Sequence, residues 1–171
     1  MISYKFYRLK PILYTENLKI MYYAFAQSYF LYAILAWGEI FKTHLKPLET
    51  VQKSILKTIF NKPRCFPSED LFAVARVCSI RILFVKTLLL YTFKHKLIPE
   101  VLHSTRASAS HKIKVPKMFT SLGQRQGAFL GPNIFNTLPT ALKLINDYTL
   151  FKKKLCLWLH AISYDQFNQI F

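Results

Sequence analysis

The feature that most constrains this fold is a run of nineteen residues without a charged side chain, residues 20 to 38, between Lys19 and Glu39. A run of about this length can cross a lipid bilayer as a helix. The run nonetheless contains four tyrosines together with Gln27 and Ser28, and tyrosine favours the membrane interface over the membrane centre. We therefore expect a helix buried against other helices. The alternative is a small basic membrane protein anchored by a helix at 20–38.

Helical periodicity extends beyond this run. The first helix is expected to begin with Thr15 as its N-cap, and apolar side chains at three- and four-residue spacing predict its buried face. That face would comprise Leu18, Met21, Tyr22, Phe25, Tyr29, Tyr32 and Ala36. A second helix is expected from Pro47 to about Phe60, with an apolar stripe of Leu48, Val51, Ile55 and Ile59 and with Lys53 and Lys57 opposite it.

Two more helices are expected before residue 103. The residues "PSED" at 67–70 are typical of a helix start, with Ser68 as the cap and two acids in the first turn. A break near Ser79 precedes a helix that is apolar on nearly every side, which predicts a central position. Pro99 is expected to end that helix.

The composition changes after Leu102, where small polar residues and three of the four glycines occur. This composition predicts a loop, short extended segments and a hairpin, with a small extended subdomain near 111–135. A last amphipathic helix is expected to start at Asp147 or Thr149. The predicted fold is mainly α, divided into a helical region at 13–103, a basic loop and short-strand region at 104–146, and a C-terminal helix at 147–164.

The charge balance points to an anionic partner. Lysine and arginine number 24 against 8 aspartates and glutamates, a formal net charge of +16, which favours binding to a polyanion. No acidic residue occurs from Val101 to Asn146. General basicity without a nucleic-acid function is the competing interpretation.

No catalytic, metal or cofactor set is predicted. Divalent-metal catalysis needs converging carboxylates, whereas the adjacent pair Glu69 and Asp70 is explained by a helix start. The five histidines lack the spacing of a zinc site, and the pair Cys156 and His160 is interpreted as packing. The three cysteines form no CxxC motif and are odd in number, which predicts a reducing compartment. The expected localisation is intracellular, with the nucleus as one candidate.

Five motifs in order resemble one known family. A helix ending in Y-x-x-x-x-W-G (Tyr32, Trp37, Gly38) is followed by L-x-x-x-Q-K (Leu48, Gln52, Lys53), by "DLFAVARVCSIRIL", by "STRAS", and by "GPNIFNTLPTALKLINDYTLFKKKLCLWL". Together they resemble the region after the polymerase core of jockey-type non-LTR (LINE-like) retrotransposon reverse transcriptases, over about Leu13 to Leu159. Phe135 stands where that family usually has tryptophan.

The resemblance implies a truncated fragment of an RNA-directed DNA polymerase that is no enzyme on its own. The family's metal-binding aspartates, which would hold Mg²⁺, would lie upstream and are absent from this sequence. The fragment would supply thumb or post-thumb contacts to RNA and DNA backbones and would dock on the missing polymerase core, with membrane binding not expected. The selected contact residues are Lys53, Lys57, Arg106, Lys112, Lys114 and Arg125. An inactive structural remnant remains a further alternative.

Overall fold

The computed structural model describes residues 2–32, 34–37, 42–95 and 112–162. These residues are mostly helical and include no β-strand, which confirms the predicted mainly α fold. The chain divides into two compact units, residues 1–83 and 84–171, and each is described by itself. The predicted boundary at residues 103 and 104 lies outside the described residues, as do Arg106 and Pro99.

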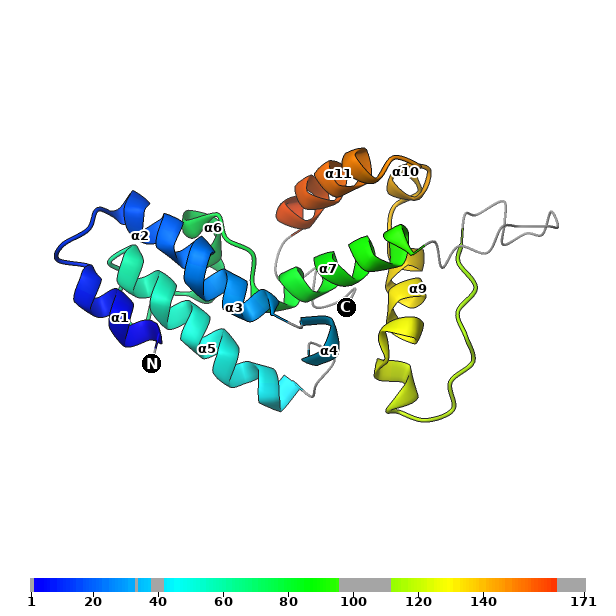
Figure 1. The fold of residues 1–171 in the computed structure, drawn as a ribbon, viewed down its shortest axis with the longest axis horizontal. Helices are drawn as coiled ribbons and strands as arrows, with labels where there is room; N and C mark the ends of the chain where they lie inside the picture. The colour runs from blue at the N-terminus through cyan, green and yellow to red at the C-terminus, as the bar shows by residue number, and fades with distance from the viewer. Residues whose placement is uncertain (1, 33, 38–41, 96–111, 163–171) are drawn as a thin grey trace. The chain divides into compact units, whose positions relative to one another are not determined.

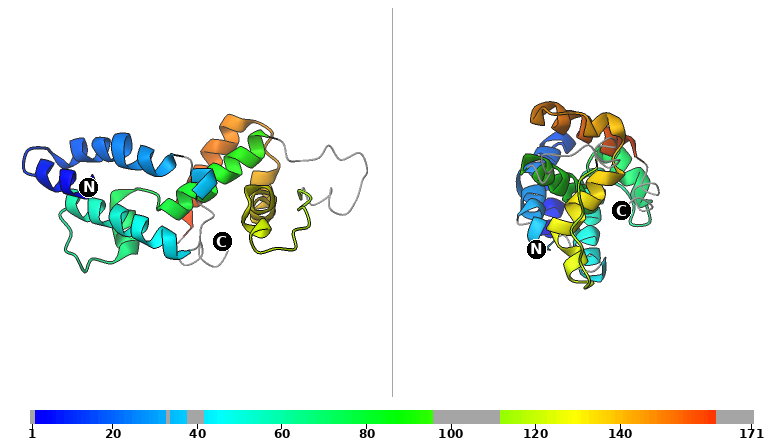
Figure 2. Two further views of the ribbon diagram at one scale, coloured as in Figure 1. Left: turned by 60° about the horizontal axis from the view of Figure 1, so that its bottom comes forward. Right: turned by 90° about the vertical axis from the view of Figure 1, so that its right-hand side faces the viewer.

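The first unit is built around one long helix. Its elements are α1 (Ile2–Leu9), α2 (Thr15–Met21), the π-helix η1 (Tyr22–Gln27), α3 (Ser28–Leu31), α4 (Ile34–Trp37), α5 (Lys42–Ile59) and α6 (Ser68–Ala75). Helices α1, α2 and α6 each contact α5. Figures 1 and 2 show α2, η1 and α3 following one another alongside α5. Their shared core includes Phe6, Leu18, Tyr22, Phe30, Ile55, Leu56 and Leu71.

The π-helix η1 changes which side chains of the uncharged run are buried. A π-turn bonds five residues back and is wider than an α-turn, so the buried positions of α2, η1 and α3 recur every four residues through Leu18, Tyr22, Ala26 and Phe30. Phe25 and Tyr29, predicted to be buried, are 63% and 64% exposed. The predicted face was therefore wrong beyond Tyr22, because it assumed a uniform α-helical period. In the described ranges, no helix combines the length and apolarity that crossing a membrane requires.

Three predicted helix starts are shifted. Thr15 and Ser68 are the first helical residues rather than the caps, because Tyr14 and Pro67 before them hold the extended backbone of an N-cap. Helix α5 begins at Lys42, five residues before Pro47. The turn before Pro47 carries the buried Leu45, and this packing accounts for a helix that continues on both sides of the proline.

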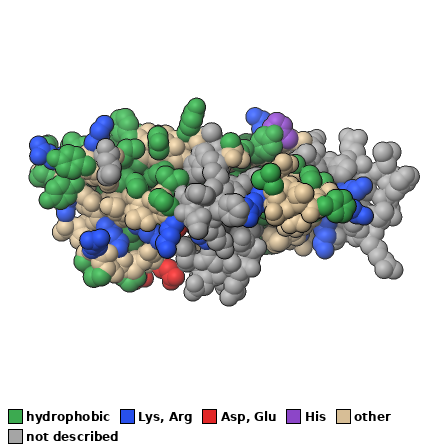
Figure 3. All heavy atoms as spheres, turned by 90° about the horizontal axis from the view of Figure 1, so that it is seen from below, with side chains coloured by type: hydrophobic (Ala, Val, Ile, Leu, Met, Phe, Trp, Pro, Cys, Tyr) green, Lys and Arg blue, Asp and Glu red, His purple; other side chains and the backbone are tan. Residues whose placement is uncertain are grey.

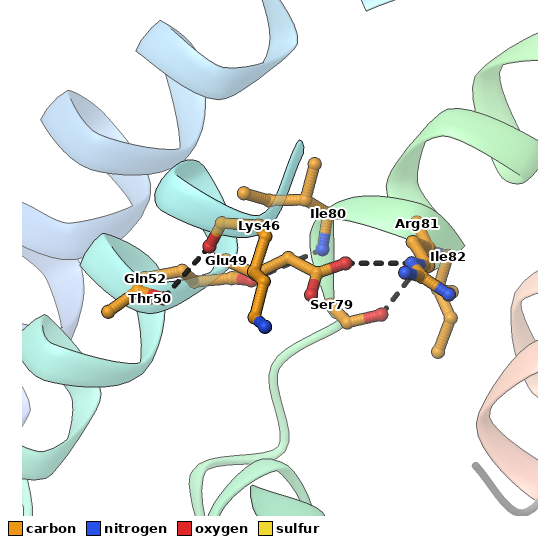
Figure 4. A network of polar contacts seen from close by, with 8 residues as sticks. All are labelled: Lys46, Glu49, Thr50, Gln52, Ser79, Ile80, Arg81 and Ile82. Atoms are coloured by element: carbon orange, nitrogen blue, oxygen red, sulfur yellow. Dashed lines mark hydrogen bonds and ion pairs between the residues drawn. The ribbon is translucent and has the colours of Figure 1, made fainter. Parts of the chain in front are cut away.

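A buried glutamine joins α2–η1, α5 and the start of α7 (Ile80–Lys94). The Gln52 side chain is fully buried; its Nε2 donates to the Tyr22 hydroxyl at 2.8 Å and to the Cys78 carbonyl at 2.9 Å, and its Oε1 accepts from the Ile80 N–H at 3.2 Å. Burial raises the pKa of the Tyr22 hydroxyl, so this group stays protonated. Figure 4 shows Gln52 reaching the start of α7.

The start of α7 is fixed by two further contacts, also drawn in Figure 4. The Ser79 hydroxyl accepts from the Ile82 N–H at 3.4 Å, and the Arg81 Nε forms an ion pair with the Glu49 carboxylate at 2.7 Å. The predicted break near Ser79 is confirmed, because α6 ends at Ala75 and α7 begins at Ile80.

The second unit contains α7 from Phe84 onward, the 3₁₀ turn η2 (Gly123–Arg125), α9 (Gly127–Thr137), α10 (Thr140–Lys143) and α11 (Tyr148–Ala161). The predicted hairpin is wrong, because the residues expected to form it make η2 and α9. Residues 112–119 have no regular secondary structure, so the predicted extended subdomain near 111–135 contains no strand within the described residues. The predicted start of the last helix is confirmed, since the Asp147 carboxylate accepts from the Leu150 N–H at 2.6 Å.

Packing explains why a segment rich in glycine and proline forms helix α9. Ile134 and Phe135 are buried on it, and Gly131 lies directly against Thr92 of α7. The Phe93 and Phe151 rings stack at 4.2 Å between centroids, with Phe135 against Phe151 at 6.3 Å. Tertiary contacts thus override the weak helix propensity of the segment.

Candidate nucleic-acid interface

The predicted contact residues fall into two groups. Lys53 and Lys57 lie on α5 in the first unit, whereas Lys112, Lys114 and Arg125 lie in the second. The residues therefore form two candidate surfaces, and each is considered within its own unit.

The two lysines on α5 are partly buried, and one of them makes a hydrogen bond within the first unit. Lys53 and Lys57 are half-buried and four residues apart, hence on one side of the helix. The Lys57 Nζ donates to the Arg64 carbonyl at 2.6 Å, which ties the loop after α5 to the helix. Lys57 therefore has a structural role that the sequence analysis did not predict.

The segment around Lys112 and Lys114 is held by one asparagine. The Ile113 N–H donates to the Asn136 Oδ1 at 2.8 Å, and the Asn136 Nδ2 donates to the Ile113 carbonyl at 2.9 Å. The amide thus pairs with the backbone as a neighbouring strand would. Ile113 is buried while Lys112 and Lys114 on either side of it are exposed. The two lysines therefore project from a fixed segment.

A third lysine completes this group. The Lys143 Nζ donates to the Asn136 backbone carbonyl at 2.7 Å, near the end of α9. Burial, and secondarily the positive charge of Lys112, lower the pKa of the Lys143 amine. Lys112 and Lys143 are thus electrostatic neighbours. We call Lys112, Lys114 and Lys143 the basic cluster.

The charge surrounding the basic cluster is strongly positive. Asp147 is the one acidic residue among the described residues of the second unit, and its carboxylate caps α11. Arg125, at the end of η2, is half-buried. Figure 3 draws one face of the molecule, on which lysine and arginine side chains are scattered among hydrophobic ones. Within the second unit, the excess of basic over acidic described side chains suits an anion with several charges.

Sequence reasoning missed Lys143 and the role of Asn136. Asn136 lies in the "FNTLP" motif, and Lys143 follows it by seven residues. The available signal was the position of this asparagine in the N-x-L-P motif, but its partner Ile113 is 23 residues away. That contact could not be read from local spacing.

The part of the chain that the structure describes contains no group of three histidine, cysteine, aspartate or glutamate residues able to hold a metal ion. Comparison with known proteins found no matching family model, no similar curated protein and no similar solved structure.

Proposed function

We propose that this chain contacts nucleic-acid backbones as the thumb and post-thumb region of a jockey-type non-LTR retrotransposon reverse transcriptase. The observation that carries the proposal is the basic cluster. Asn136 holds the Ile113 backbone between Lys112 and Lys114 and also binds the Lys143 amine, in a unit with one described carboxylate. The five motifs in family order support the assignment. Mg²⁺ and the catalytic aspartates belong to the polymerase core on which this region would dock.

The geometry favours contact with phosphates over the recognition of bases. A lysine ammonium is a compact point charge that suits a phosphate oxygen. Base recognition typically relies on planar side chains placed in a groove. Lys112 and Lys114 project from an irregular segment rather than from a helix or ribbon. Contacts of this kind position a duplex without selecting its sequence.

Two motif residues also gain a physical role under this proposal. Gln52 of the L-x-x-x-Q-K motif and Asn136 of the N-x-L-P motif both use donor and acceptor atoms of the side-chain amide to hold backbone from another part of the chain. Asn136 therefore fixes the segment that presents Lys112 and Lys114, and Gln52 stabilises the fold of the first unit. Neither needs to touch nucleic acid.

Duplex binding by the wild-type protein is expected to fall steeply with salt and to be nearly independent of sequence. If each lysine of the basic cluster neutralises one phosphate, the log–log slope of the association constant against salt is about −3, at about 0.9 per phosphate. Fluorescence anisotropy with two unrelated DNA duplexes and one RNA–DNA hybrid, between about 50 and 200 mM salt, measures this slope. A slope near zero, or affinities that differ more than about tenfold between the duplexes, would contradict the proposal.

A further inference from the structure

The first unit exposes an uncharged face along α2, η1 and α3. The buried positions of this run recur every four residues from Leu18 to Phe30, so the positions two residues further on, half a turn away, point away from the core. These outward positions are Ile20, Ala24, Ser28 and Tyr32, and all four are exposed. Phe25 and Tyr29 lie on the flank beside this row and are also exposed. We call these six residues the uncharged face.

The uncharged face can be buried without enclosing a charge. No charged residue occurs between Lys19 and Glu39, and Lys19 lies on the opposite flank of the run from Phe25. The Ser28 hydroxyl shares its hydrogen bond between the Ala24 carbonyl and the Phe25 carbonyl, one turn back in its own helix. Covering Ser28 therefore leaves no hydroxyl without a partner.

The outward row has the same order of side-chain sizes in both directions. Its ends, Ile20 and Tyr32, are large, and its middle residues, Ala24 and Ser28, are small. Two copies packed antiparallel through this row would place the small residues of one opposite the small residues of the other, as an isologous contact requires. Small side chains at the crossing point let two helices approach closely. The row is therefore complementary to a second copy of itself.

The flanking rings extend the same contact. A twofold axis places the same flank of both helices on one side of the interface, so Phe25 of one copy would lie beside Tyr29 of the other. Ile20, Phe25, Tyr29 and Tyr32 are 66%, 63%, 64% and 78% exposed. At about 200 Å² for each side chain, two copies would bury roughly 1,000 Å², the lower limit for a specific interface. This area predicts a weak dimer.

We propose that two copies of this chain associate antiparallel through the uncharged face, about a twofold axis between Ala24 and Ser28. A chain with a net charge of +16 repels its own copies over most of its surface, and at this face two copies meet without opposing charges. The inference goes beyond the proposed function and does not depend on it, because the basic cluster belongs to the second unit.

Sedimentation equilibrium of the nuclease-treated full chain tests the proposal. The wild type is expected to dimerise with a dissociation constant of about 10 µM, measured between about 5 and 200 µM protein. The dimer should strengthen as salt rises from about 0.1 to 0.5 M, because salt screens the repulsion between two positively charged copies. Nucleic-acid binding changes with salt in the opposite direction.

The Ala24→Arg variant places a charge from each copy beside the proposed axis. Its dissociation constant is expected to rise at least about 100-fold, because opposed like charges at an interface are strongly unfavourable. The matched control, Ala73→Arg, adds the same charge at an exposed position of α6 and should stay within about twofold of the wild type. Phe25→Ala/Tyr29→Ala adds no charge and should weaken the dimer by about tenfold or more. All the replaced side chains are exposed, so circular dichroism should match the wild type.

Four results would overturn the inference: a wild type that stays monomeric, a dimer that Ala24→Arg leaves intact, equal losses in Ala24→Arg and Ala73→Arg, or association that nuclease treatment abolishes. The last result would mean that bound nucleic acid bridges the copies. A dimer lost in Ala24→Arg, in a protein that does not bind duplex, would support the inference and refute the proposed function.

Discussion

Replacing Gln52 by alanine is expected to lower the free energy of unfolding by about 3 kcal/mol. The substitution removes the hydrogen-bond partner of the Ile80 N–H, the Cys78 carbonyl and the Tyr22 hydroxyl together. A buried polar group left without a partner costs about 1–3 kcal/mol. The effect is large because one side chain connects three parts of the first unit.

Urea titration followed by circular dichroism measures this effect. Tyr22→Phe should cost about 1 kcal/mol, because Gln52 then keeps its two backbone contacts. Lys53→Ala, on the adjacent half-buried position of α5, should shift stability by about 0.5 kcal/mol or less. Similar midpoints for the Gln52 and Lys53 variants would show that the hydrogen bonds of Gln52 do not stabilise the fold.

Replacing Gly131 by alanine is expected to destabilise the second unit by about 1–3 kcal/mol, the usual cost of overpacking a core. A Cβ at this position would lie 2.3 Å from the Thr92 Oγ1. Thr92 is fully buried, and its hydroxyl donates to the Leu88 carbonyl at 2.9 Å within α7, so it cannot easily move. The clash outweighs the gain of about 1 kcal/mol that alanine brings to a helix interior.

The Gly131→Ala/Thr92→Ala variant isolates this clash. Removing the Thr92 hydroxyl leaves the Thr92 Cβ at 3.5 Å from the new methyl group, an ordinary contact. The double variant should therefore be more stable than Gly131→Ala alone, by about 1 kcal/mol or more in a double-mutant cycle. Additive effects of the two substitutions would rule out direct contact between α7 and α9 at Gly131.

The fold was predictable where local signals decide it. The break near Ser79 and the cap at Asp147 follow from residues within one turn of the helix end. The buried face beyond Tyr22 was not predictable, because a π-helix is defined by its hydrogen bonds and not by composition. Helix α9 was missed for another reason: glycine and proline favour turns locally, and the contact between Gly131 and Thr92 is long-range.

The candidate site was predictable in part. The stretch without acids drew attention to Lys112 and Lys114, and the structure places both on one fixed segment. Their connection to Lys143 runs through Asn136, whose side chain binds Ile113 and whose carbonyl binds the lysine amine. Because this connection runs through the side chain and the carbonyl of a single asparagine, no regular residue spacing in the sequence reveals it.

The claim that the basic cluster around Asn136 contacts nucleic-acid backbones is tested most directly by comparing two matched double variants on one labelled duplex. Lys112→Gln/Lys114→Gln removes two charges of the basic cluster, and Lys152→Gln/Lys153→Gln removes two exposed charges of α11. The first should reduce the salt slope by about 2 and weaken binding to all sequences alike, and the second should leave the slope near the wild-type value. Equal reductions in both variants would show that binding depends on diffuse positive charge and would contradict a defined backbone-contact site around Asn136.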